Sequence, residues 1–432
     1  MNDNTIKLLN LEHMSHRIES IETIYSALQV RVLIQLKKEM VVCPVCSTQT
    51  QTVHDYQTKS ITHSISTNHH CLIIYRARRY RCKSCKKVFY EHNPFAGYYR
   101  TISDYTKLSI LNHLKSYTST FTSAARSYHT SIQSVINIFD DFIDAKRQTL
   151  PEYICMDEFF TAKVSDYKYA CMLTDFKTHQ VIDVYATRHK HYLKQCFSRI
   201  PKRERDTVKV FIIDMWDSYK EVIELCFPKA KIAVDSFHVI RILNEAMKKI
   251  RIETMNLFNK KTSSLESNDI YYYMLKKFHY FFVKDYEKIY NGKIKIPKLN
   301  AAWHKSDILN YLFGTSDSLK KAYKLKEAYR EFNKSAEVDT CELEFDQLIK
   351  QFRNHDHLSF RAFGKTLKKW KPEIMNSFER VENRRLSNGS IEGMNSRVKT
   401  IIKSANGLRN FYRMRNRIMF SLNKNTPIKY IK

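Results

Sequence analysis

The stretch TVKVFIIDMWDSYKEVIELCFPKAKIAVDSFHVI, residues 207–240, contains two apolar runs that each end at an aspartate. The first run ends at Asp214 and the second at Asp235, and a segment with helical spacing follows each of them. Short apolar runs that alternate with helices are typical of buried strands in a βαβ unit. We therefore predict a strand, a helix from Ser218, a second strand and a helix from Ser236.

Three further strand-like runs precede this unit: EYICMD at 152–157, KYACMLTDF at 168–176 and QVIDVYATR at 180–188. Three strands in succession and then a βαβ rhythm predict an α/β mixed sheet of the ribonuclease H type over residues 151–255. In that fold the first and fourth strands lie side by side. Asp157 would end the first strand and Asp214 the fourth, so we expect their carboxylates to lie close together.

Two neighbouring carboxylates repel each other unless cations lie between them. Two Mg²⁺ or Mn²⁺ ions roughly 3.5 to 4 Å apart would relieve this repulsion, activate water and orient a phosphodiester. A third acidic residue, Glu392, opens an amphipathic basic helix in RRLSNGSIEGMNSRVKTIIK at 384–403. Aspartates at strand ends are also common as turn formers and helix caps, and this alternative stays open here.

Helical spacing gives residues 390–404 two distinct faces. The apolar face consists of Ile391, Met394, Val398 and Ile401. The polar face consists of Glu392, Asn395, Lys399 and Lys403. A carboxylate in line with two lysines fits a metal ligand beside a DNA phosphate; an ordinary Glu–Lys helix face is the alternative.

The chain is strongly basic. It has 73 Lys and Arg against 44 Asp and Glu, a formal net charge of +29 over 432 residues. Such an excess predicts a polyanionic partner. The basic residues recur along the whole chain among aromatics and form no concentrated amphipathic anchor, so nucleic acid is favoured over an anionic membrane surface.

Other compositional features exclude whole classes of protein. No apolar run approaches the roughly 20 residues that span a bilayer, and the start, MNDNTIKLLN, lacks a signal peptide pattern, so we expect a cytoplasmic protein without a membrane partner. No glycine lies between Gly97 and Gly292. Glycine-rich phosphate cradles need that residue, which excludes nucleotide cofactors bound in those ways.

Two CxxC pairs predict a structural Zn²⁺ site. They are Cys43-Pro-Val-Cys46 and Cys82-Lys-Ser-Cys85, and together they supply the four thiolates of a tetrahedral site. We expect a zinc ribbon over residues 41–93, after an N-terminal segment 1–40. A redox CxxC is the alternative for either pair alone.

One arm of the ribbon, CLIIYRARRYR at 71–81, is the densest basic stretch of the chain. On an alternating strand, its first two arginines share one face and its last two the other, so both faces could contact phosphates. These predicted DNA contacts are Arg76, Arg78, Arg79 and Arg81. A solvated edge strand protected by charge is the alternative.

Residues 100–150 have a three-helix outline that predicts a helix-turn-helix DNA-binding domain. Its last helix presents Ser131, Gln133 and Ser134 near its start, where a recognition helix reads base edges. An ordinary helical linker domain is the alternative, because the turn lacks glycine. Residues 256–385 show helical periodicity with few breaks and predict an all-α insertion, after which 386–432 returns to the catalytic core.

Together these features resemble an ISL-three family insertion-sequence transposase over essentially the full length. The motifs that carry the resemblance are the paired zinc knuckles, the helix-turn-helix, MDEF at 156–159, IIDMWDSY at 212–219, DSFHV at 235–239 and SNGSIEGMNSRVK at 387–399. The resemblance implies a ribonuclease H-like domain with a helical insertion and a catalytic DDE triad of Asp157, Asp214 and Glu392. It also implies that His238 approaches the scissile phosphate, for which a packed histidine behind a capping aspartate is the alternative.

The function implied is metal-dependent DNA cleavage and strand transfer at the terminal inverted repeats of a bacterial mobile element, joining the 3′-OH to target DNA. The partners expected are DNA, in association with the nucleoid, and a second copy of the chain, because two ends must be brought together. The alternatives are a non-catalytic zinc-ribbon and helix-turn-helix regulator and a structure-specific metal-dependent nuclease.

Overall fold

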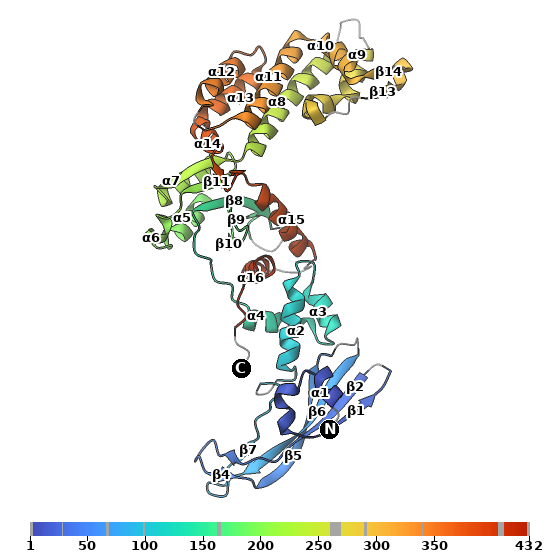
Figure 1. Cartoon of the computed structure of the whole chain (residues 1–432), viewed down its shortest axis with the longest axis vertical. Helices are drawn as coiled ribbons and strands as arrows, with labels where there is room; N and C mark the ends of the chain where they lie inside the picture. The colour runs from blue at the N-terminus through green and yellow to red at the C-terminus, as the bar shows by residue number, and fades with distance from the viewer. Residues whose placement is uncertain are drawn as a thin grey trace. The chain divides into compact units, whose positions relative to one another are not determined.

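The computed structural model describes residues 3–27, 29–65, 69–97, 100–161, 166–259, 269–288, 292–338, 340–404 and 410–429. These residues form two compact units (Figure 1). The first comprises residues 1–147, 159–168 and 394–432, and the second 148–158 and 169–393. Within the described ranges, none of the helices combines the length and apolar character that crossing a bilayer requires.

The first unit begins with a five-stranded sheet. Strands β1 (Ile18–Tyr25), β2 (Gln29–Leu36), β6 (His70–Arg81) and β5 (Val53–His63) lie in the order β1-β2-β6-β5, and β7 (Val88–Tyr90) pairs with β6. The helix α1 (Asp3–Leu8) and the 3-10 turn η1 (Glu12–Arg17) share its apolar core. The N-terminal segment therefore supplies two strands to the sheet that also carries the arms of the ribbon. The short strands β3 (Val41–Val42) and β4 (Gln49–Thr50) form a separate hairpin.

Three helices follow this sheet: α2 (Asp104–Lys115), α3 (Phe121–Ser127) and α4 (Ile132–Phe142). Ser103 caps α2, because its hydroxyl accepts from Thr106 N at 3.1 Å. In the turn before α4, His129 adopts a φ of 49° and takes the left-handed conformation that glycine would otherwise supply. The helix α16 (Phe411–Leu422) packs on the three, with the Phe139 and Phe420 rings 6.0 Å apart.

The second unit contains the predicted mixed sheet. Its strands are β8 (Tyr153–Phe160), β9 (Tyr169–Asp175), β10 (Val181–Tyr185), β11 (Val210–Ile213) and β12 (Lys231–Val234), in the order β10-β9-β8-β11-β12. The pair β9 and β10 is antiparallel, whereas β11 runs parallel to both β8 and β12. The prediction that the first and fourth strands are neighbours is confirmed.

Helices surround this sheet and extend beyond it. The predicted helices from Ser218 and Ser236 are α7 (Asp217–Cys226) and α8 (Ser236–Asn256); α5 (Lys190–Ser198) and α6 (Lys202–Arg205) were not predicted. The remaining helices are α9 (Asp269–Lys277), α10 (Lys305–Phe313), α11 (Asp317–Ser335), α12 (Glu342–Arg353), α13 (Leu358–Lys369), α14 (Lys371–Asn376) and α15 (Gly389–Ser404), with 3-10 turns η2 (His279–Phe282), η3 (Tyr286–Lys288) and η4 (Pro297–Leu299).

The expectation of an all-α insertion over 256–385 needs correction. Two antiparallel hairpins interrupt the helices: β13 (Lys293–Ile296) with β14 (Ala301–His304), and β15 (Arg380–Val381) with β16 (Arg384–Arg385). The first hairpin turns at Asn300, which has a φ of 49°, and the second at Glu382 and Asn383, with φ of 52° and 62°. Asparagine tolerates this left-handed backbone, so short hairpins form without glycine.

Candidate active site and metal centre

The register of the sheet brings Asp157 and Asp214 to the same level on adjacent strands. In the parallel pair of β8 and β11, Ile212 lies opposite Cys155. Continued two residues past this last pair, the register leads to Asp214 and Asp157, and the charge of Asp214 acts on Asp157. Asp214 follows the last residue of β11, as predicted, whereas Asp157 lies inside β8, which continues to Phe160. The expectation that Asp157 ends its strand is therefore wrong, because the apolar residues of DEFF extend the pairing.

The surroundings of Asp157 disfavour its negative charge. Burial and then the charge of Asp214 raise the pKa of Asp157 to about 7. Asp214 Oδ1 is buried and, within the described chain, lacks a hydrogen-bond partner. A buried carboxylate oxygen without a partner, beside a second carboxylate, is the donor set that a divalent oxygen-binding cation fits.

His238 contacts the same pair from the first turn of α8. Its Nε2 lies 2.7 Å from Asp214 Oδ2, and its Nδ1 lies 3.5 Å from Asp235 Oδ2. Asp235 caps α8 by accepting from Phe237 N at 3.3 Å. Burial lowers the pKa of His238, but the Asp214 and Asp235 carboxylates outweigh it and raise that pKa to about 9. The imidazolium thus orients one carboxylate of the pair.

The start of α15 packs against β8 next to Asp157. Asn388 Nδ2 donates to Met156 O at 3.5 Å, and the Cys155 thiol lies 3.8 Å from Ser387 O. Glu392 lies one turn further on, where its backbone N–H donates to Asn388 O at 3.2 Å, and its side chain is exposed. The oxygens of the three carboxylates do not all lie within 4.8 Å of one another. Among the described residues, the four cysteines are the one group of possible metal ligands that lie so close together.

The two faces of α15 differ from the prediction at one residue. Ile391, Met394, Val398 and Ile401 are buried, as predicted. Lys399 and Lys403 are exposed, but Asn395 is buried at 7% exposure. Asn395 therefore lies under the surface of the protein and is not available to a DNA phosphate.

Arg188 is a neighbour of the site that sequence reasoning missed. Its guanidinium donates to Glu158 Oε1 at 2.7 Å and stacks on the Trp216 ring at 4.8 Å. The Tyr219 hydroxyl donates to the other Glu158 oxygen at 3.2 Å. The group joins the residues next to Asp157 and Asp214. Only the proximity of Arg188 to a strand end could have suggested it, since no motif contains it.

The four predicted zinc ligands form one cluster. The Sγ atoms of Cys43, Cys46, Cys82 and Cys85 all lie within 4.8 Å of one another. The closest pairs are Cys46 with Cys82 and with Cys85, both at 3.4 Å, and Cys43 with Cys85 at 3.6 Å. A tetrahedral site with Zn–S bonds of about 2.3 Å requires sulfur separations of about 3.8 Å. The cluster therefore fits one structural zinc ion.

The two zinc knuckles have matching backbones. The residue after each second cysteine, Ser47 in one knuckle and Lys86 in the other, has a positive φ, 58° and 62°. The Thr48 hydroxyl, 3.4 Å from Cys46 Sγ, and the Thr48 backbone N–H lower the pKa of the Cys46 thiol to about 6. The lowered pKa favours the thiolate form that binds metal.

The basic arm β6 exposes only some of its arginines to solvent. Arg76 and Arg81 are exposed, and Arg79 pairs with Asp55 at 2.9 Å. Arg78 is buried at 2% exposure, where it donates to Leu36 O at 2.6 Å and pairs with Glu91 at 3.5 Å. The expectation of a phosphate contact at Arg78 needs correction, because that guanidinium ties two strands together inside the unit.

The predicted base-reading residues lie at the start of α4. Ser131 caps the helix by accepting from Ser134 N at 3.0 Å, and the two hydroxyls lie 2.9 Å apart. Gln133 is exposed and donates to Asn137 Oδ1 at 2.7 Å. Of the three side chains, Gln133 is thus the one that projects into solvent with an amide able to pair with a base edge.

Comparison with known families adds two findings. Residues 154–418 match a family model described as a transposase, the DDE domain of the ISL3 type. Residues 39–85 match a model described as the zinc finger of the transposases IS204, IS1001, IS1096 and IS1165. The first match spans the mixed sheet, the helical part and α15, and the second includes all four clustered cysteines. A search of curated proteins gives no match.

Proposed function

Because this chain belongs to the ISL3 family of insertion-sequence transposases, we propose that it binds the terminal inverted repeats of its own element and cleaves the DNA ends. It then joins each freed 3′-OH to target DNA. The observation that carries this proposal is the pair of adjacent carboxylates, Asp157 and Asp214, of which Asp214 Oδ1 is buried without a hydrogen-bond partner among the described residues. In this proposal the mixed sheet is a ribonuclease H-like core.

Asp157 and Asp214 hold divalent cations in this proposal, and Glu392 completes the set from the exposed face of α15. When bound, Mg²⁺ or Mn²⁺ supplies charge neutralisation at the phosphodiester and a more acidic water. The polypeptide fixes the direction of the two aspartates through the rigid parallel register of β8 and β11. Glu392 would join the pair from the first turn of α15, whose start contacts β8 next to Asp157.

His238 acts as a positioning residue. Its imidazole donates to Asp214 and keeps one oxygen of that carboxylate engaged, so the other oxygen is left to face the cation. Groups that orient a metal-binding side chain typically contribute about 10- to 100-fold to metal affinity or activity. Asp235 supports the histidine from the opposite ring nitrogen.

DNA recognition in this proposal belongs to the first unit. The zinc ribbon and the helices α2, α3 and α4, as a helix-turn-helix with α4 as the recognition helix, read the terminal repeat. The proposed contacts are Arg76, Arg79, Arg81, Ser131, Gln133, Ser134, Lys399 and Lys403. Two copies of the chain would bring two ends together, as a homodimer on nucleoid DNA.

A cleavage assay tests the function. The substrate is a duplex that carries an inverted repeat found in the DNA on both sides of the gene, compared with random duplex, in Mg²⁺. We expect wild-type cleavage at the repeat end, loss of cleavage for Asp157→Asn, Asp214→Asn and Glu392→Gln with end binding retained, and cleavage about 10- to 100-fold slower for His238→Ala. Cleavage of random duplex at the same rate would favour the nuclease alternative.

Specific end binding by a wild-type protein that cleaves nothing would instead favour the regulator. The matched control is Asp175→Asn, which changes an aspartate at the end of β9 that lies outside the proposed triad. This control should cleave like the wild type.

A further inference from the structure

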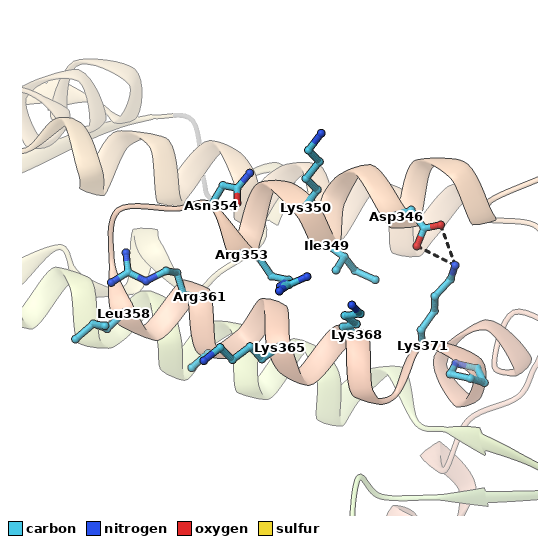
Figure 2. Close-up of a pocket in the computed structure, with 12 residues that line it drawn as sticks. Asp346, Ile349, Lys350, Arg353, Asn354, Leu358, Arg361, Lys365, Lys368 and Lys371 are labelled. Atoms are coloured by element: carbon cyan, nitrogen blue, oxygen red, sulfur yellow. Dashed lines mark hydrogen bonds and ion pairs between the residues drawn. The ribbon is translucent and has the colours of Figure 1, made fainter.

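A basic groove lies in the helical part of the second unit, apart from the aspartate pair. The helices α12 and α13 form a hairpin, and the groove between them has a volume of about 930 Å³ (Figure 2). Six basic side chains and one carboxylate line it. The basic ones are Lys350, Arg353, Arg361, Lys365, Lys368 and Lys371.

Two of these cations are already engaged. Lys371 pairs with the carboxylates of Asp346 and Glu342, each at 2.8 Å. Arg361 donates to the backbone oxygens of His355 and Asp356, at 3.0 and 2.8 Å, and so closes the turn of the hairpin. These contacts hold the two ends of the groove.

The other four cations lack a carboxylate within ion-pair distance among the residues that the structure describes. Lys350, Arg353, Lys365 and Lys368 are exposed. Figure 2 shows Arg353 and Lys368 between the two helices, where they face the same space. Like charges gathered in one concavity repel each other, so this arrangement favours an anionic partner.

A rigid core fixes the spacing of these charges. Gly364 of α13 packs directly on the end of α12: a Cβ at this position would lie 2.8 Å from Arg353 N and 2.9 Å from Phe352 Cβ. Beneath the contact, the rings of Phe352 and Phe363 lie 4.9 Å apart. The basic side chains thus project from a hairpin whose two helices cannot slide or separate easily.

The spacing matches a DNA backbone. Arg361, whose contacts to the two backbone oxygens are both made by Nη1, stands in line with Lys365 and Lys368 at i, i+4 and i+7 along one face of α13. This stripe covers about 10 Å at 1.5 Å per residue. One strand of duplex DNA carries a phosphate about every 3.4 Å along the axis, so this stripe spans about three phosphates. Arg353 and Lys350 add charge from the facing helix.

A concave cationic groove accepts a convex phosphate ridge, but it cannot enter a DNA groove to reach base edges. Lysine, which supplies most of the available charge, contacts phosphate as a point charge and is depleted at protein interfaces. The groove therefore suits the backbone of duplex DNA of any sequence better than an acidic protein.

We propose that the groove between α12 and α13 binds the phosphate backbone of target DNA without regard to sequence. The target role rests on the proposed function, since strand transfer needs a second duplex in addition to the element end. The terminal repeat is read elsewhere, by the first unit.

The test uses the full zinc-loaded chain and a triple variant, Lys350→Gln, Lys365→Gln and Lys368→Gln. The control variant, Lys249→Gln, Lys320→Gln and Lys324→Gln, removes the same charge from exposed lysines of α8 and α11 outside the groove. A third variant replaces the three groove lysines by arginine and keeps the charge. Affinity for random duplex is measured by fluorescence anisotropy between 50 and 200 mM salt, a range over which about six to ten phosphate contacts cost 10³- to 10⁵-fold.

We expect the glutamine variant to bind random duplex at least about tenfold more weakly. The slope of the logarithm of its binding constant against the logarithm of salt concentration should be smaller in magnitude by about three, one for each lost phosphate contact. The control and the arginine variant should bind like the wild type. The glutamine variant should still cleave repeat ends but transfer them poorly into target DNA.

Equal salt slopes for the glutamine variant and the control would overturn the proposal. Binding of poly-glutamate that is lost in the glutamine variant, while its DNA affinity is unchanged, would also overturn it and assign the groove to an acidic protein. If the wild type cleaves no ends but binds random duplex through these lysines, the proposed function fails while the phosphate contact stands.

Discussion

At the scale of single residues, the aspartate pair owes its properties to register. In a parallel pair of strands, residues the same number of positions along each strand lie side by side. Asp157 and Asp214 therefore become neighbours although 57 positions separate them in the sequence. A bound cation would relieve the repulsion between the two carboxylates and the cost of burying their charge. His238 then holds one carboxylate in place, at 2.7 Å.

Arg78 and Arg76 form a matched pair for a prediction on the ribbon arm. Arg78→Ala should destabilise the first sheet by about 3 kcal/mol, because it removes a buried ion pair with Glu91 and leaves Leu36 O without its donor. Arg76→Ala removes an exposed guanidinium over the Tyr56 ring, 4.3 Å away, and should cost less than about 1 kcal/mol.

Hydrogen exchange of the β2 and β6 amides measures this difference as an opening free energy. The affinity for random duplex should rank the two variants in the opposite order. Arg76→Ala should weaken this affinity more than Arg78→Ala, since only Arg76 of the two is available to phosphate. Equal protection of β6 in both variants would show that the Arg78 pair contributes nothing to the sheet.

The sequence predicted that the two aspartates are neighbours, because both follow apolar runs that read as adjacent strands. It misassigned Arg78 and Asn395, because alternation and helical spacing tell which residues share a face but not what covers that face. Arg78 shares a side of β6 with exposed Arg76, yet the carbonyls at the end of β2 cover it. Burial of this kind depends on partners far away in the sequence.

At the scale of elements, Gly364 sets the distance between α12 and α13. Gly364→Ala should destabilise the second unit by about 1 to 3 kcal/mol, because the added Cβ meets the backbone of Arg353 and overpacks the hairpin. The gain in helix propensity, about 1 kcal/mol, offsets only part of this cost.

Gly393→Ala is the matched control, since a Cβ there meets no atom of the described residues within 4 Å and the residue also lies in a helix. It should be neutral or stabilising. Thermal unfolding followed by tryptophan fluorescence reports on the second unit, which contains Trp216, Trp303 and Trp370. A Gly364→Ala variant as stable as the control would contradict the close packing.

Helices and strands whose apolar residues follow one regular spacing were predictable from the sequence, and those with an ambiguous spacing were not. The five strands of the mixed sheet lie in mainly apolar segments, although Asp183 interrupts β10. The strand β1 was missed because Ile18, Ile21 and Ile24 recur every three residues, a spacing closer to a helix than to a strand. The helix α5 was missed although it buries Leu193 and Phe197 at helical spacing, since it is only nine residues long and no side chain caps its start.

At the scale of the whole molecule, loss of the zinc site should affect end binding without unfolding the second unit. Cys43→Ser should lose zinc and specific end binding, because structural zinc typically contributes about 10 to 16 kcal/mol to the folding of small zinc domains. Cys71→Ala, which changes a buried thiol of β6 outside the quartet, should keep the metal.

Metal content by mass spectrometry and end binding by anisotropy check this prediction together. The second unit should keep its tryptophan unfolding transition in both variants. Zinc retained at full stoichiometry in Cys43→Ser would contradict the assignment of the four ligands.

The central claim is that Asp157, Asp214 and Glu392 jointly hold divalent cations on the DNA. Electron paramagnetic resonance of Mn²⁺, titrated into the zinc-loaded protein bound to a repeat-end duplex, tests it most directly. We predict two Mn²⁺ ions per active site, coupled at about 3.5 to 4 Å, in the wild type. The coupled signal should vanish in Asp157→Asn, Asp214→Asn and Glu392→Gln. An unchanged signal in any of these variants would contradict the claim.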